Sequence, residues 1–126
     1  MTNWIKILGQ TPSQKNNKNV GVNRHSGKIF FTSNNRVKDW QESAGWQLKT
    51  VKPHEGKVGI TYIFYVKDNR SRDVDNMIAS VNDALVKAGI IENDDWQHLT
   101  IRQAMGVLDK TNPRCELKIE KIRTAP

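Results

Sequence analysis

Acidic side chains gather in two short stretches of this chain, and they are its best candidates for chemistry. Asp73 and Asp75 stand two residues apart, where a predicted strand gives way to a predicted helix. In an extended segment, side chains two residues apart project to the same side. Two carboxylates held close together repel each other unless a shared proton or a cation relieves the repulsion, and a hard divalent ion does so well. The pair therefore favours a metal site.

The second acidic stretch is Glu92, Asn93, Asp94 and Asp95, which follows the predicted helix. Asp94 is the expected third metal ligand. A helix of about 13 residues spans roughly 20 Å, so Asp94 reaches Asp73 only if the loop folds back or a second subunit contributes. The sequence leaves both routes open.

A purely structural interpretation of the first pair is also available. Asp75 could cap the helix, while Asp73 forms an ion pair with Arg70 or Arg72. For an isolated Asp-x-Asp pair this would be the better interpretation, and the second acidic stretch shifts the balance towards a metal. Two further acids are weaker candidates: Asp83 could orient the helix or a metal-bound water, and Asp95 could support the site or face solvent.

The elements that must position these residues follow from apolar periodicity and turn residues. A strand dense in β-branched and aromatic side chains delivers the chain through a charged turn to Asp73, and it is the best candidate for a central strand. Helical spacing places Trp40 and Trp46 among the packing residues, whereas Trp96 could stack on a base or pack in a core. We expect strands at residues 4–8, 28–32, 57–66, 98–108 and 114–122, helices at 35–50 and 76–88, a loop at 9–19, and a turn at 109–113 joining the last two strands.

Composition narrows the class of protein. The 126 residues suit one domain, 1–126, and a formal charge of +7 suits a polyanionic partner. There is one cysteine, Cys115, so an intramolecular disulfide is excluded. The three histidines, His25, His54 and His98, are scattered singly and give no support to a zinc cluster. Isolated glycines argue against a nucleotide cofactor. We find no apolar run long enough for a secretory signal or a membrane span, and expect a cytoplasmic protein.

Basic residues flank the acidic pair and also occupy the N-terminal region. The N-terminal group is equally consistent with an arm for phosphate contacts and with a solvated loop. The second group adjoins the acidic pair, and Arg72 is the first candidate to stabilise a charged transition state. The expected DNA-binding residues are Lys15, Lys18, Arg24, Lys28, Lys67, Arg70, Arg72 and Asn76.

The segment SRDVDNMIASVNDALVKAGIIENDDWQHL resembles the signature region of the RusA-type Holliday-junction resolvases. Several separated elements agree in identity and spacing, and the TPSQKNNK segment is more weakly similar to the family's PPS-N element. The matching positions of the signature are Arg72, Asp73, Asp75, Asn76, Asp83, Ala84, Leu85, Ala88, Gly89 and Asp94.

The resemblance implies a homodimeric α+β fold with a mixed β-sheet packed with two main helices. It also implies that the substrate is branched DNA, a four-way junction, cut in a reaction that depends on Mg²⁺ or Mn²⁺. Asp73, Asp75 and Asp94 would hold the metal, with Arg72 among the catalytic residues.

One departure from the family pattern bears on activity. The family commonly has a Lys with a part in catalysis four residues after the second aspartate, and Ala79 stands there. We expect Lys67, Arg70, Arg72 or Lys87 to substitute for it. The alternative is a catalytically weak or inactive protein that binds branched DNA, and an RNA-processing nuclease ranks last because no RNA-binding aromatic motif is visible.

Overall fold

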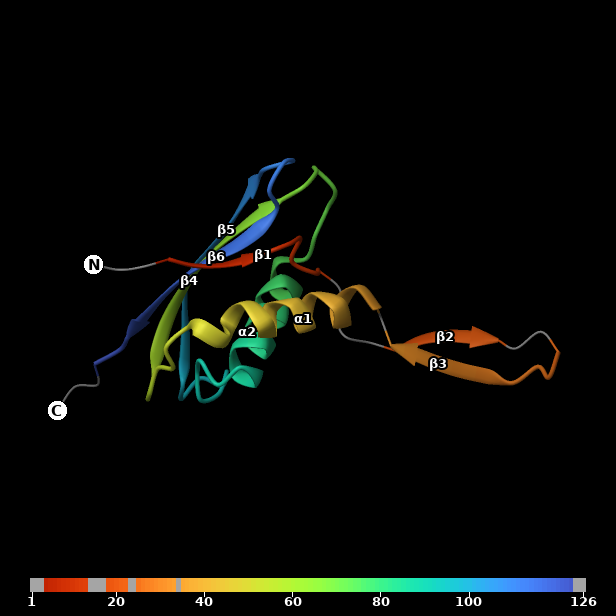
Figure 1. Ribbon diagram of the computed structural model, residues 1–126, viewed down its shortest axis with the longest axis horizontal. Coiled ribbons are helices and arrows are strands. Elements are labelled where there is room, and N and C mark those ends of the chain that lie inside the picture. Colours follow the sequence, from red (N-terminus) through yellow and green to blue (C-terminus); the bar gives the residue numbers. More distant parts are fainter. Residues whose placement is uncertain (1–3, 14–17, 23–24, 34, 124–126) are drawn as a thin grey trace.

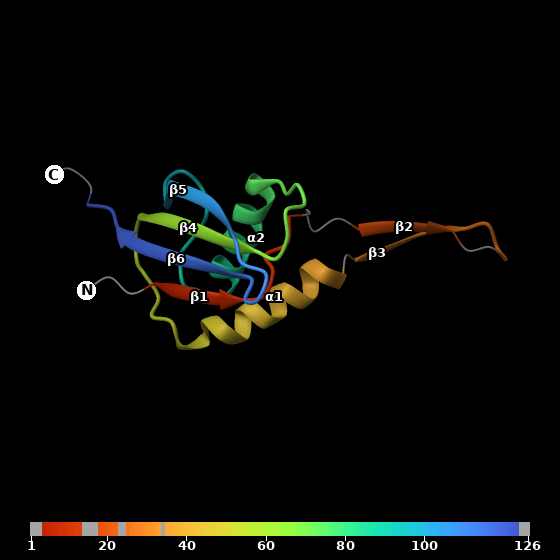
Figure 2. The same cartoon turned by 90° about the horizontal axis from the view of Figure 1, so that it is seen from above.

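The computed structural model, which describes residues 4–13, 18–22, 25–33 and 35–123, has the expected α+β architecture. Two helices cover one face of a four-stranded sheet, and a separate β-hairpin extends away from them (Figures 1 and 2). In chain order the elements are β1 (Ile5–Leu8), β2 (Lys18–Val22), β3 (Ile29–Ser33), α1 (Asn35–Gln47), a 3₁₀ turn (Leu48–Thr50), β4 (Val58–Val66), α2 (Val74–Lys87), β5 (Leu99–Leu108) and β6 (Arg114–Lys121).

The hairpin corrects one prediction. Residues 9–19 were expected to form a loop, but Lys18–Val22 forms β2 and pairs antiparallel with β3. The polar residues that begin β2 carry little strand propensity, and the backbone pairing with β3 outweighs this local preference.

The sheet is mixed, with the order β1-β6-β4-β5. β4 lies between two neighbours, as predicted, and pairs parallel with β5 and antiparallel with β6. The last two strands therefore do not lie side by side, and the turn at residues 109–113 carries the chain across β4. Because α2 connects two parallel strands, it begins at the carboxyl end of β4 and ends near the amino end of β5.

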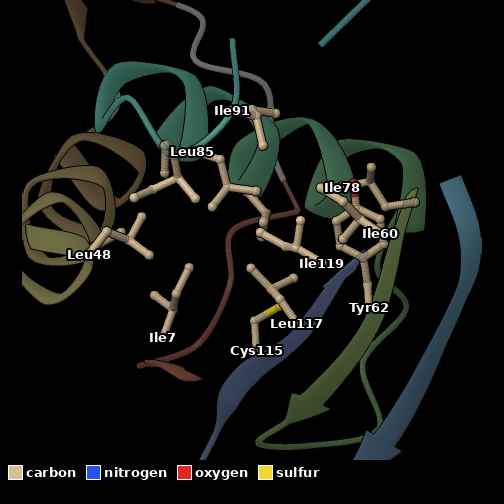
Figure 3. Close-up of a cluster of buried hydrophobic side chains, with 14 of the residues drawn as sticks. Ile7, Leu48, Ile60, Tyr62, Ile78, Leu85, Ile91, Cys115, Leu117 and Ile119 are labelled. Atoms are coloured by element: carbon tan, nitrogen blue, oxygen red, sulfur yellow. The ribbon is translucent and has the colours of Figure 1, made fainter. Parts of the chain in front are cut away.

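The core lies between the sheet and both helices (Figure 3). Along β6 the buried side chains of Cys115, Leu117 and Ile119 alternate with partly exposed polar ones, so one face of the sheet meets the helices. Burial raises the pKa of the Cys115 thiol, which is a packed side chain as expected. Within α1, Trp40 packs in the core as predicted, but Trp46 is 71% exposed, so its helical spacing was misleading.

A buried hydrogen bond joins α2 to the central strand. The Tyr62 hydroxyl donates to Asn82 Oδ1 at 2.6 Å, and neither side chain is accessible enough to pair with bulk water instead. This contact fixes the rotation of α2 over β4, and with it the direction of every side chain on that helix. None of the described helices is long and apolar enough to cross a membrane.

Candidate active site

Asp73 is the N-cap of α2. Its backbone is extended, and its Oδ1 accepts hydrogen bonds from the backbone N–H groups of Asp75 at 2.9 Å and Asn76 at 3.4 Å. The structural alternative had given this capping role to Asp75, which instead lies in the first helical turn. Both capping bonds go to one oxygen, so Oδ2 of Asp73 remains available to a ligand.

Asp75 is exposed beside this cap, and it makes no hydrogen bond or ion pair with the part of the chain that the structure describes. Negative charge is favourable at a helix N-terminus, because the first N–H groups point outwards there. The local fold therefore tolerates two exposed carboxylates at this end of the sheet.

The loop before Asp73 is held by Arg72 and Asp68. The Arg72 guanidinium lies 2.8 Å from Asp68 Oδ1, and it also donates to the backbone carbonyls of Asp68 and Arg70 at 3.1 and 3.2 Å. A backbone hydrogen bond from Arg70, together with this guanidinium, lowers the pKa of Asp68. Only 12% of the Arg72 side chain is exposed. Its visible task is to shape the loop that presents Asp73.

An N-terminal segment packs against the first turns of α2. Asn76 Nδ2 donates to the Ser13 carbonyl at 3.0 Å, and Ser80 Oγ donates to the Pro12 carbonyl at 3.4 Å. Asn76, an expected DNA contact, anchors the 11–13 segment through this bond. Ser80 is buried. The sequence drew attention to residues 11–13 through the TPS motif, but its composition did not predict that this segment would pack against α2.

A cleft of about 550 Å³ opens between this segment, the start of α1 and the loop before Asp73. Four cationic residues, Arg36, Lys67, Arg70 and Arg72, are among those that line the cleft, against one acid, Asp39. Lys67 and Arg70 are exposed. The cleft therefore offers positive charge close to the acidic pair, as a phosphate backbone requires.

Asp94 lies towards the other end of α2. Burial and then the negative charge of Asp94 raise the pKa of Asp83, and Asp94 also contributes to the raised pKa of Tyr62. Asp94 is thus close to Asp83, which comes ten residues after Asp73 and so lies about 15 Å along the helix from it.

Within one chain the three predicted ligands do not converge. The described residues, which include Asp73, Asp75 and Asp94, contain no group of three or more His, Cys, Asp or Glu side chains placed to hold a metal ion. The fold brings Asp73 and Asp75 together and leaves Asp94 apart from them.

The loop that carries Asp94 is tied together by His98. His98 Nδ1 lies 2.6 Å from Asp95 Oδ1, and its Nε2 lies 3.6 Å from Glu92, whose other oxygen accepts from the Gly56 backbone. The hydrogen bond from His98 lowers the pKa of Asp95. Asp95 is therefore a structural partner of His98. Trp96 is 78% exposed beside the loop, which excludes core burial in the single chain.

Two of the remaining expected DNA-binding residues, Lys18 and Lys28, lie in or beside the hairpin. Lys28 is exposed just before β3, and Lys18 begins β2. Lys15 and Arg24 lie outside the described residues.

Two comparisons with known proteins bear on the family of this chain. Residues 10–120 match the family described as Endodeoxyribonuclease RusA. The chain is 34% identical over 93 residues to the Crossover junction endodeoxyribonuclease RusA of Aquifex aeolicus (strain VF5), an alignment that covers 70% of this chain and 69% of the relative. The family match over residues 10–120 spans β4, α2 and β5, with both acidic stretches. The chain belongs to the endodeoxyribonuclease RusA family.

Proposed function

We propose that this protein is a Mg²⁺-dependent endonuclease that resolves four-way DNA junctions by paired phosphodiester hydrolysis. The observation that carries the proposal is the pair of exposed carboxylates, Asp73 and Asp75, held by the cap of α2 beside a cationic cleft. The name of the Aquifex relative, a crossover junction endodeoxyribonuclease, supports the choice of a junction as substrate.

The donor set fits a hard divalent cation. Asp73 Oδ2 and the carboxylate of Asp75 are oxygen donors in solvent contact. Asp94 is the proposed third donor, and because it lies apart from the pair within one chain, it would have to come from a second subunit. A bound Mg²⁺ would lower the pKa of a coordinated water and stabilise the leaving oxygen. The capping bonds orient the Asp73 carboxylate before any ion arrives, so less motion is frozen on binding.

Cations of this chain would hold the DNA. Lys67 and Arg70 are placed to bind phosphates in the cleft, with Lys15, Lys18, Arg24 and Lys28 extending the contact from the hairpin region. We propose a supporting part for Arg72, because its guanidinium is committed to Asp68 and the loop carbonyls. It would act by keeping Asp73 in place.

Ala79 favours a second candidate function. It is exposed on α2, one turn after Asp75, where the family pattern has a Lys. A chain that lacks this cation could bind branched DNA and cleave it slowly or not at all.

A cleavage assay separates the two functions. Wild-type protein is incubated with a labelled four-way junction and with the matching linear duplex, in Mg²⁺, in Mn²⁺ and in EDTA. The nuclease predicts symmetrical nicks in the junction alone, and only with a metal present. Tight junction binding without nicks under either metal would favour the binding protein.

A further inference from the structure

Trp96 is the most exposed of the large hydrophobic side chains that the structure describes, with 78% of its surface accessible. Its indole N–H has no hydrogen-bond partner among the described residues. A single exposed apolar side chain is ordinary on a protein surface. Two features set this one apart: the turn that carries it is held by several hydrogen bonds, and it stands two residues after Asp94.

The turn that carries Trp96 is fixed by Asp95. Asp95 Oδ1 accepts hydrogen bonds from the backbone N–H groups of Gln97 and His98, both at 3.1 Å, and the Asp95 carbonyl also accepts from His98 at 3.1 Å. The His98 carbonyl accepts from the N–H of Val58 at 2.9 Å, which joins the turn to the start of β4. These bonds close the backbone around Trp96 and leave its ring outside. The fold therefore presents the ring to solvent in a fixed place.

The Trp96 ring is only loosely contacted. Lys57 Nζ lies over the ring at 5.8 Å from its centroid, near the outer limit of about 6 Å for a cation–π contact. Trp46, which is 71% exposed, differs in this respect, because Lys49 Nζ covers its ring at 3.7 Å. Trp96 therefore keeps flat aromatic surface for a ligand, with a cation beside it.

The charges around this ring favour an uncharged partner surface. Asp94 is exposed and the side chain of Glu92 is 50% exposed, whereas Asp95 is paired with His98 at 2.6 Å. A phosphate group placed on the ring would be repelled by these carboxylates. The neutral face of a nucleic-acid base would not, and every base has a face that stacks favourably on an aromatic side chain.

We propose that Trp96 is a stacking site for a DNA base at the branch point of a four-way junction, and that this contact favours junctions over linear duplex. The inference rests on the proposed function, which brings Asp94 to the phosphate that is cut. Cα atoms two residues apart are separated by at most about 7 Å, which corresponds to about two nucleotides along a strand. Trp96 would therefore meet a base close to the cut.

The branch point is where such a site finds a base. Within a linear duplex each base pair stacks on two neighbours, so a side chain gains a base face only by separating a stacked step. At a branch point the stacking is interrupted, and a base pair can present an uncovered face. A fixed tryptophan would add affinity for the branched form, whereas contacts with phosphates are common to both forms.

Binding in EDTA measures this site apart from cleavage. The affinities of the protein for a labelled four-way junction and for the matching linear duplex are compared at one salt concentration. Trp96→Ala should weaken junction binding at least ~5-fold and leave duplex binding within about twofold of wild type. Trp46→Ala is the matched control and should change neither affinity. A folded Trp96→Ala protein with the wild-type preference for junctions would overturn the stacking site and leave the ring to a protein partner.

The wild-type protein separates this inference from the function on which it rests. A junction preference that is lost in Trp96→Ala, in a wild type that nicks no DNA, would support the stacking site and remove the nuclease. A wild type that neither prefers nor nicks the junction would overturn both. Sedimentation of wild type and Trp96→Ala should show the same association state, and a change would place the ring between two copies of the chain instead of on DNA.

Two further substitutions separate stacking from simple apolar contact. Trp96→Phe keeps an aromatic face and should retain most of the preference for junctions. Trp96→Leu keeps apolar bulk without a ring and should bind as Trp96→Ala does. A Trp96→Leu protein with the wild-type preference would contradict stacking.

Photo-cross-linking locates the contact on the DNA. One junction carries 5-bromouracil beside the branch point, and a second carries it in the middle of an arm. Each is irradiated with wild-type protein, and the cross-linked peptide is identified by mass spectrometry. The proposal predicts a cross-link to Trp96 from the first junction. Cross-links to other residues with none to Trp96, or equal yields at Trp96 from both junctions, would overturn it.

Discussion

At the scale of single residues, Asp73 has a structural role and a carboxylate oxygen free for a ligand. One carboxylate oxygen caps α2 through two backbone N–H groups, and the other is available to a ligand. The sequence pattern located this residue as a site candidate, and only the structural alternative considered a cap, which it placed at Asp75. Cap geometry depends on where the helix begins, and helix boundaries are the least certain part of a pattern-based prediction.

Two substitutions at this position separate chemistry from folding. Asparagine is itself a good N-cap, so Asp73→Asn should change the free energy of unfolding little while lowering nicking at least ~100-fold. Asp73→Ala should lose the same activity and also about 1 kcal/mol of stability. Urea denaturation and junction nicking measure the two effects. Glu42→Gln, an exposed carboxylate of α1, is the control and should leave both unchanged.

Asp109 predicts a pH dependence of stability. A hydrogen bond from Arg114 lowers its pKa below the ordinary 3.8, with help from Thr111. A carboxylate whose pKa is lower in the folded state contributes stability above its unfolded pKa, and loses it as pH falls through the folded value. Asp109→Asn should therefore be less stable than wild type at pH 7, with the difference vanishing in acid.

Denaturant unfolding at pH 7 and near pH 2 measures whether the difference in stability between Asp109→Asn and wild type disappears in acid. Asp39→Asn, on the exposed side of α1, removes the same charge without breaking the Arg114 contact. A constant difference between Asp109→Asn and wild type at both pH values would contradict the assignment.

At the scale of elements, the loop before Asp73 and the helix after it form one unit. The loop is closed by Arg72 and Asp68, the helix is fixed over β4 by Tyr62 and Asn82, and the 11–13 segment packs on its first turns. These contacts decide where the acidic pair points. The contacts of Tyr62 with Asn82 and of Asn76 with Ser13 join residues far apart in the chain, so the sequence alone did not predict them.

Tyr62→Phe tests the link between helix and sheet. Removing the hydroxyl leaves the buried Oδ1 of Asn82 without its donor, which should cost about 1–2 kcal/mol. Tyr65→Phe is the matched control, because the Tyr65 ring packs under Arg114 and its hydroxyl bonds no described residue. Equal stability of the Tyr62→Phe and wild-type proteins in urea would show that this bond does not fix α2.

Lys67 and Arg70 predict the salt dependence of DNA binding. If each contacts one phosphate, Lys67→Ala or Arg70→Ala should weaken junction binding and reduce the slope of log affinity against log salt by about 1. Lys52→Ala, which lies beyond the cleft, should leave the slope unchanged. An unaltered slope in both cleft variants would remove the cleft from the DNA interface.

At the scale of the whole molecule, much of the fold could be predicted. The central strand, both helices and the acidic pair follow from periodicity and spacing. Strand order could not be predicted, because the turn at residues 109–113 reports only a local reversal, whereas β4 separates β5 from β6. The position of Asp94 relative to Asp73 depends on that order and on any partner, so the sequence left it open.

The exposed β5 also belongs to this scale. Its apolar residues were predicted as an ordinary strand, and alternation alone cannot show that Ile101, Met105, Val107 and Leu108 stay exposed among the described residues. Trp46 is the opposite case, since helical spacing predicted burial and the end of α1 leaves it exposed. In both cases the exposure of the side chain depends on which other element packs against it. That is decided by the assembled fold and not by the local sequence pattern.

Asp75→Asn gives the most direct test of the central claim, that the acidic pair at the start of α2 carries the chemistry. Asp75 is exposed and forms no hydrogen bond or ion pair with a described residue, so the Asp75→Asn protein should fold and bind a four-way junction as wild type does. With Mg²⁺ present, we predict that nicking of the bound junction falls at least ~100-fold. Nicking at the wild-type rate by a folded, junction-bound Asp75→Asn protein would contradict the account.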